Sequence, residues 1–124
     1  YVFMTEHYKL LRLLKKYPVL RKIVSKIQRD ERIKLAILFG SYAKGYAKKD
    51  SDIDIYIETN NLQIKKEIEG IDSRISVKIG KFDRGNYLIR EIIKDHVIIK
   101  GVERFYEKAK IFDWPSKGRK VETD

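Results

Sequence analysis

Two aspartates separated by one residue give the strongest chemical signal in this sequence. Asp52 and Asp54 begin a stretch, residues 52–58, in which polar and apolar residues alternate strictly. Such alternation predicts a β-strand, in which side chains two positions apart project from the same face, about 6.6 Å apart along the backbone. Two carboxylates so placed repel each other unless water or a cation screens them, and Mg²⁺ prefers oxygen ligands together with substrate phosphates. The pair therefore predicts a metal–nucleotide site.

A Gly-Ser pair lies upstream of the aspartates, directly after the apolar run of residues 35–39, which predicts a strand buried on both faces. Gly40 lets the backbone approach a bulky anion, the Ser41 hydroxyl is a donor, and a helix starting there would direct free N–H groups at phosphate. Gly40 and Gly45 also have the glycine spacing of a P-loop, but Tyr46-Ala47 stands where that motif needs Lys-Ser/Thr. We therefore expect a phosphate-binding turn of another kind.

Each element alone is also compatible with a plain turn or a solvated strand edge. Together they are far more specific, because residues 38–45 (Leu-Phe-Gly-Ser-Tyr-Ala-Lys-Gly) and 50–55 (Asp-Ser-Asp-Ile-Asp-Ile) contain Gly-Ser, ten residues and then Asp-x-Asp without insertion. This pattern closely resembles the signature of the minimal nucleotidyltransferases in the DNA polymerase beta superfamily. The resemblance extends over roughly residues 34–105, judged by the order of the expected elements.

The resemblance implies an α+β (α/β) fold, with a small mixed sheet and helices on one side of it. It also implies that the protein binds ATP or another NTP with Mg²⁺ as cofactor. Gly40, Ser41 and Ser51 would then bind the nucleotide, whereas Asp52 and Asp54 would be the catalytic metal ligands. The function implied is transfer of a nucleoside monophosphate, AMP from ATP, to a hydroxyl of a protein or small-molecule acceptor. Many members pair with a small helical HEPN-type toxin, which they neutralise as antitoxins.

The sequence departs from the family pattern at one place. The superfamily commonly carries a third carboxylate on the neighbouring strand, but the matching positions hold Ser76, Lys78 and Gly80. Lys78 could replace a metal charge or be an ordinary exposed strand lysine. The alternative function is therefore a catalytically degenerate module that neutralises or scaffolds a partner protein.

The elements expected to hold the motif alternate between helices and strands. We expect two N-terminal helices separated by Pro18, strands within residues 35–39, 52–58, 75–79 and 97–99, and a helix capped by Asn60 or Asn61. Asp83 is the expected cap of a later helix, and a last helix includes Phe105. Residues 1–30 are either part of the domain or a connector from an upstream domain, residues 31–112 form the nucleotidyltransferase domain, and residues 113–124 form a tail, ordered only if Trp114 docks.

Composition sets wider limits. The 28 Lys and Arg residues exceed the 18 Asp and Glu residues, for a net charge of +10, but this charge alone supports a nucleic-acid partner only weakly, since it also suits a heat-adapted surface. No membrane span or signal peptide is evident, so we expect a cytoplasmic protein, and a homo-oligomer stays open. The chain begins with Tyr1, so a preceding segment is an open alternative.

Aromatic and histidine residues give weaker signals. Tyr42, Tyr46 and Tyr56 near the motif could stack on a base or simply pack in the core. His7 and His96 have no metal-ligand spacing to each other or to cysteine, which the chain lacks, and we expect both at the surface.

Overall fold

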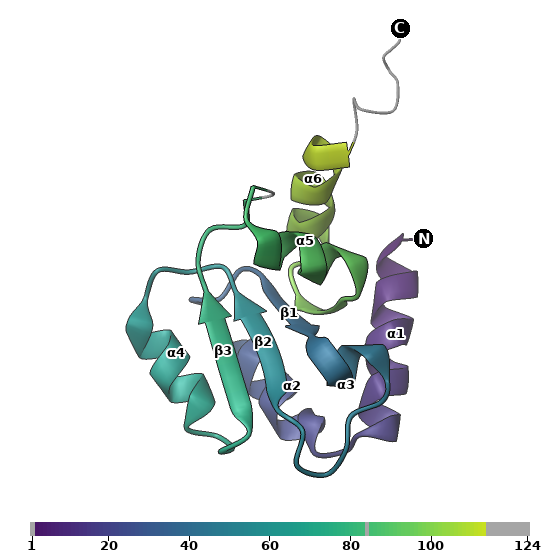
Figure 1. Ribbon diagram of the computed structural model, residues 1–124, viewed down its shortest axis with the longest axis vertical. Helices are drawn as coiled ribbons and strands as arrows, with labels where there is room; N and C mark the ends of the chain where they lie inside the picture. The colour runs from purple at the N-terminus through teal and green to yellow at the C-terminus, as the bar shows by residue number, and fades with distance from the viewer. Residues whose placement is uncertain (1, 84, 114–124) are drawn as a thin grey trace, which may run out of the picture.

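The computed structural model describes the backbone of residues 2–83 and 85–113 and the side chains of residues 4–83 and 85–109. Helices and strands alternate along this part of the chain after two initial helices (Figure 1). The elements are α1 (Val2–Lys16), α2 (Leu20–Arg29), β1 (Ala36–Phe39), α3 (Gly40–Lys44), β2 (Ile53–Ile57), α4 (Leu62–Glu69), β3 (Ile75–Ile79), α5 (Tyr87–Lys94), β4 (Val97–Lys100) and α6 (Val102–Asp113). The expected tail around Trp114 lies outside the described residues.

The strands form one mixed sheet in the order β3-β2-β1-β4. β1 is antiparallel to both β2 and β4, whereas β2 and β3 are parallel. The α+β fold with a small mixed sheet and two preceding helices is therefore confirmed. The sheet places the end of β1, the start of β2 and the start of β3 side by side, where Asp54 lies opposite Phe39 on one neighbour and Ser76 on the other.

One face of the sheet is covered by α1, α2 and α4 (Figure 1). The apolar stripe of α2 is fully buried there, because its four core residues recur at helical spacing: Leu20, Ile23, Val24 and Ile27. Ile53, Ile55 and Ile57 of β2 point into the same cluster. Leu10 of α1 joins this core and is only 3% exposed.

The opposite face carries a second core under α5 and α6, so the expectation of helices on one side only is wrong. Tyr56 is the clearest case, because strict alternation placed it on the polar face of β2, yet it is 1% exposed and packs against Phe82 with ring centroids 5.9 Å apart. Its hydroxyl donates a hydrogen bond of 2.6 Å to the Gly80 carbonyl. Figure 1 shows that α5 and α6 lie over one half of this face and leave the other half open. Asp54, two residues before Tyr56 on β2, is partly exposed.

Helix ends and the sheet edge show how local chemistry fixes these elements. The Asn61 side chain caps α4, as expected, but α5 is capped by Asn86 and not by Asp83, because the helix begins at Tyr87.

On the edge strand β3, Lys65 of α4 donates to the Val77 carbonyl at 2.6 Å, and Glu69 of α4 accepts from the Val77 N–H at 2.9 Å. These side chains cover backbone groups that would otherwise offer an edge for pairing with another strand. Within the described residues, every helix is too short or too polar to cross a bilayer.

Candidate active site

Gly40 and Asp54 are in direct contact across the β1–β2 pair, although they are far apart in the motif. A Cβ placed on Gly40 would overlap a carboxylate oxygen of Asp54. The backbone at Gly40 has a φ of 76°, which lies in the left-handed region that side chains rarely adopt. Only glycine therefore lets the Gly40-Ser41 turn lie directly against the carboxylate. This contact joins the two halves of the motif in one site.

The short helix α3 begins at Gly40 and ends at Lys44, so Ser41 lies in its first turn. Gly45 ends the helix in a left-handed conformation with a φ of 87°, and its N–H bonds back to the Ser41 carbonyl at 3.1 Å. Ser41 is partly exposed, and its hydroxyl makes no hydrogen bond to the other described residues. It is therefore free to donate a hydrogen bond to a ligand.

The loop between α3 and β2 is held by side chains from distant elements. Arg74 forms an ion pair with Asp72 at 2.8 Å and donates to the Lys49 carbonyl at 2.9 Å. The Arg74 carbonyl also accepts from the Ile53 N–H at 2.8 Å. These bonds fix the position of the residues just before Asp52.

Ser51 has a local role in this loop. Its hydroxyl oxygen accepts a hydrogen bond of 2.8 Å from the Lys48 N–H, and its own N–H donates to the Lys48 carbonyl at 3.0 Å. The Ser51 hydroxyl thus closes a turn, and its proton can still be donated. The predicted nucleotide contact of Ser51 stays a prediction.

The two aspartates differ in their surroundings. Asp52 is exposed at the end of the loop, whereas Asp54 is partly buried on β2. Burial raises the pKa of Asp54 above its ordinary value, the negative charge of Asp52 raises it further, and the positive charge of Lys78 acts against both. The charged carboxylate of Asp54 is therefore disfavoured by its environment, and a bound cation would relieve that cost.

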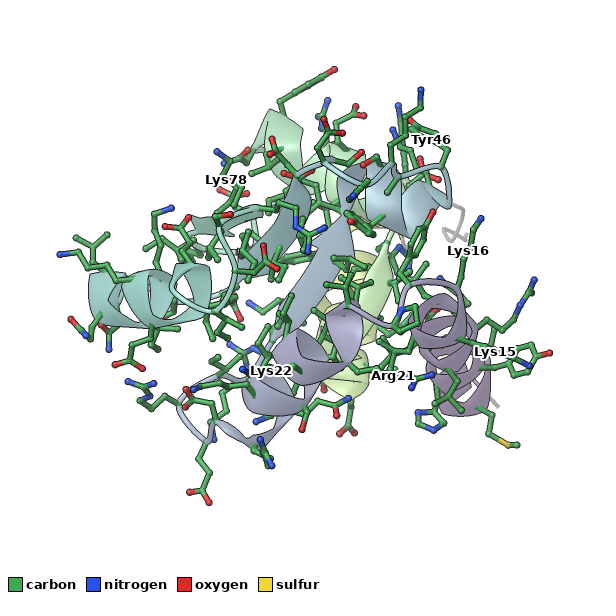
Figure 2. All side chains as sticks on the ribbon, turned by 90° about the horizontal axis from the view of Figure 1, so that it is seen from below. Lys15, Lys16, Arg21, Lys22, Tyr46 and Lys78 are labelled. Atoms are coloured by element: carbon green, nitrogen blue, oxygen red, sulfur yellow. The ribbon has the colours of Figure 1, made fainter. Side chains whose placement is uncertain are left out.

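A third carboxylate does not accompany this pair in the described part of the chain. Ser76 lies opposite Asp54 in the β2–β3 register, and Lys78 lies opposite Tyr56. Asp72, the nearest acid before β3, is engaged by Arg74, whose hydrogen bond lowers the pKa of Asp72 to about 2. Among residues 4–83 and 85–109, no three His, Asp or Glu side chains form a group suited to a metal ion. Lys78 is exposed on the open face, where Figure 2 shows it well away from α1 and α2.

The aromatic residues near the motif have separate roles. Tyr42 is 2% exposed and packs edge-on against Tyr17, with centroids 4.8 Å apart, so it supports the core and not a ligand. Tyr56 is likewise buried. Tyr46 is 65% exposed and is the one of these three tyrosines that stays accessible for stacking on a base.

Sequence reasoning missed two residues that position the site. Arg74 anchors the loop before Asp52, and the Tyr17 hydroxyl accepts a hydrogen bond of 3.1 Å from the Ala47 N–H. The spacing Asp72-x-Arg74 was a usable signal, because two residues of opposite charge at that spacing can form a local ion pair. Tyr17 gave no local signal, since its partner is 30 residues away.

The chain is similar to a known family and to solved structures. The family described as polymerase beta, nucleotidyltransferase matches residues 21–104. One similar solved structure is the crystal structure of a toxin–antitoxin with AMP-PNP, which has 14% identity and a TM-score of 0.43 and covers 89% of this chain and 94% of that one. Another is a mutant of the toxin–antitoxin MntA–HpeT, which has 12% identity and a TM-score of 0.44 and covers 81% of this chain and 94% of that one. Among curated proteins, none matches significantly.

Proposed function

The chain belongs to the polymerase beta nucleotidyltransferase family, and we propose that it is an Mg²⁺-dependent enzyme that transfers AMP from ATP to an acceptor hydroxyl. The observation that carries this proposal is the contact between Gly40 and the Asp54 carboxylate. It brings a backbone turn suited to phosphate against a carboxylate suited to metal, and these are the two components that a metal-bound triphosphate requires.

The residues fit a divalent cation in charge and in ligand type. Asp52 and Asp54 supply oxygen ligands from one end of β2, and the raised pKa of Asp54 reflects a local excess of negative charge and burial that a cation would offset. Mg²⁺ held there would neutralise the charge that develops on the phosphates. We assign to Gly40 and Ser41 the binding of the triphosphate, and Ser51 is a further donor at the edge of the site.

The proposed reaction is a substitution at the α-phosphorus of ATP. The acceptor oxygen forms a bond to that phosphorus, the bond to the oxygen that bridges the α- and β-phosphates breaks, pyrophosphate leaves, and the hydroxyl proton passes to solvent. Gly40 and Ser41 would hold the triphosphate in line, so the protein contributes chiefly by positioning and electrostatics. The acceptor hydroxyl belongs to a protein or a small molecule.

The first test is calorimetric titration of Mg²⁺ and ATP into the protein and into a variant with Asp52→Asn and Asp54→Asn. We expect Mg²⁺-dependent binding in the wild type and none in the double variant. Asp50→Asn is the control, because it makes the same chemical change, with the loss of one charge, at an exposed neighbour outside the proposed ligand set. Unchanged binding in the double variant, or no binding in the wild type, would contradict the proposal.

A second candidate function is a binding module that neutralises or scaffolds a HEPN-type helical partner without catalysis. The specific observation in its favour is that Ser76, a residue without charge, lies opposite Asp54 where the family commonly has an acid. If the acceptor in the first proposal is this helical partner, transfer of AMP to the partner would need Asp54. Coexpression with a helical protein encoded beside this chain separates the two. A complex that survives Asp54→Asn, with no label passing to the partner from ATP radioactive at the α-phosphorus, supports the module. A partner that becomes labelled supports the enzyme.

A further inference from the structure

A large basic pocket lies beside the candidate active site. Its volume is about 710 Å³, and its walls come from α1, the end of α3 and the turn between α5 and β4. The lining includes five cationic side chains and a single carboxylate, that of Asp95. The cations are Lys9, Arg12, Lys15, Lys16 and Lys94.

Most of these charges lie on one helix. Lys9, Arg12 and Lys16 follow at intervals of three and four residues, which places them on one face of α1 over roughly 10 Å of helix axis. Like charges at these intervals repel and lower helix stability. Cations that line a pocket produce a stronger positive potential than the same charges on a convex surface, where solvent separates them.

The cations differ in how far they are neutralised. Lys9 pairs with the buried Glu6 at 3.1 Å, and Lys16 donates to the Gly45 carbonyl at 2.6 Å, which leaves two of its three N–H donors. Arg12 lies over the ring of Tyr8 at 5.8 Å from the centroid and makes no ion pair to another described residue. Lys15 is exposed and likewise makes no ion pair within the described part of the chain. At least two full positive charges thus face the pocket without a carboxylate partner.

An exposed aromatic ring completes the lining. Tyr8 is 62% exposed and stands beside Arg12 at the pocket wall. Every base has a π-face that can stack on such a ring, and phosphates are the anions that a row of Arg and Lys binds. Figure 2 shows Lys16 on the side of α1 toward the loop that carries Tyr46, whereas Arg21 and Lys22 project from α2.

We propose that this pocket binds a ligand with several phosphates in a row, as in a single-stranded nucleic acid or a free oligophosphate. The row on α1 supplies cations along about 10 Å, which matches an extended chain of phosphates better than a single phosphate ion. The site is distinct from the metal site, because it lies at the far end of α3 from Gly40 and contains neither Asp52 nor Asp54. It needs neither Mg²⁺ nor transfer activity.

The test uses two probes without divalent metal, in EDTA: a fluorescent ten-nucleotide oligouridylate and inorganic tripolyphosphate. We compare the wild type with a variant carrying Arg12→Gln and Lys15→Gln. The expected loss of oligouridylate affinity is roughly tenfold or more at 0.1 M salt, and the slope of log affinity against log salt should fall by about 1.4 for two lost contacts. The matched control carries Lys22→Gln and Lys26→Gln, two exposed lysines on α2 outside the pocket.

Tyr8→Ala distinguishes the two sources of phosphate. If a nucleic acid is the ligand, this variant weakens oligouridylate by roughly tenfold and leaves tripolyphosphate unchanged. If a free oligophosphate is the ligand, tripolyphosphate binds the wild type at least as tightly as oligouridylate does, and Tyr8→Ala changes neither probe. The proposal is overturned if the wild type binds neither probe, or if the α2 control loses as much affinity as the α1 variant. Circular dichroism spectra that match the wild type establish that each variant is folded.

Discussion

Replacing Gly40 with alanine tests the contact on which the active-site proposal depends. The added Cβ would overlap the Asp54 carboxylate, and the backbone φ of 76° is unfavourable for any residue with a side chain. Gly45→Ala is a matched control, because Gly45 has a similar φ of 87° but its Cβ would meet only the flexible end of Lys16, at an ordinary 3.6 Å. The two variants therefore share the backbone strain and differ in the displacement of Asp54.

The expected magnitudes follow from these two contributions. A residue with a side chain in the left-handed region costs about 1–2 kcal/mol, so Gly45→Ala should lower the free energy of unfolding by about that amount. Gly40→Ala must also push the Asp54 side chain away from its preferred rotamer, which adds roughly 0.5–1.5 kcal/mol. For a chain of this length, each kcal/mol corresponds to a fall of roughly 4 °C in the melting temperature.

Thermal melts and calorimetric titration with Mg²⁺ and ATP provide the assay. Both variants should melt below the wild type, with Gly40→Ala the lower. Only Gly40→Ala should lose Mg²⁺-dependent ATP binding, because only there are the proposed metal ligand and the proposed phosphate-binding turn pushed apart. Wild-type affinity in Gly40→Ala would refute the reasoning, and so would an equal loss of affinity in Gly45→Ala.

Further substitutions test the electrostatics of the site. The pKa of Asp54 is raised in the folded state, so its carboxyl favours folding below the unfolded pKa of about 3.9 and loses that contribution as pH rises through the folded pKa. Without metal, Asp54→Asn should therefore unfold at a higher urea concentration than the wild type at pH 7. Equal urea midpoints at pH 7 would contradict this. Arg74 lowers the pKa of Asp72 to about 2, so the contribution of Asp72 to folding stability is present above about pH 3.9 and is lost as pH falls toward 2. Asp72→Asn should therefore be less stable than the wild type at pH 7. A stability difference that persists unchanged at pH 2.5 would refute this role of the ion pair. Ser76→Asp would place a third carboxylate opposite Asp54 and should tighten Mg²⁺ binding several-fold in calorimetry, while lowering stability without metal. Unchanged Mg²⁺ affinity would show that this position does not reach the ion.

Local patterns in the sequence were sufficient for most of the elements. The apolar run before Gly40 predicted a strand buried on both faces, and Leu35 and Ile37 indeed pack in one core while Ala36 and Leu38 pack in the other. The Gly-Ser and Asp-x-Asp pairs could also be recognised from the sequence, because the residues within each pair are close together and each residue type has a physical reason to be there. What the spacing could not give was the distance between the pairs, which depends on the antiparallel register of β1 and β2.

Apart from the helix cap assigned to Asp83, the predictions that proved wrong concern packing between distant segments. Alternation along β2 placed Tyr56 on a polar face, but α5 and α6 cover that part of the face, and no local pattern encodes their docking. The same docking partly buries His96, expected at the surface, against Phe105 with ring centroids 4.4 Å apart. A hydrophobic period shows that a residue has an apolar side, but not which helix will meet it.

The charges of the open sheet face make a bound cation a requirement of the proposed chemistry. A triphosphate carries several negative charges, and Asp52 and Asp54 would repel it if nothing lay between them. Lys78 offsets part of this repulsion, since its charge already acts on Asp54, but one exposed ammonium cannot supply the coordination that links carboxylates to phosphates. Asp52 and Asp54 are the proposed ligands, and no three His, Asp or Glu side chains form a group suited to a metal ion among the described residues. The proposed site therefore has ligands for one divalent ion more readily than for two. We therefore expect the Mg²⁺ stoichiometry in the presence of ATP to be one per chain, and to rise to two only when Ser76 is replaced by aspartate.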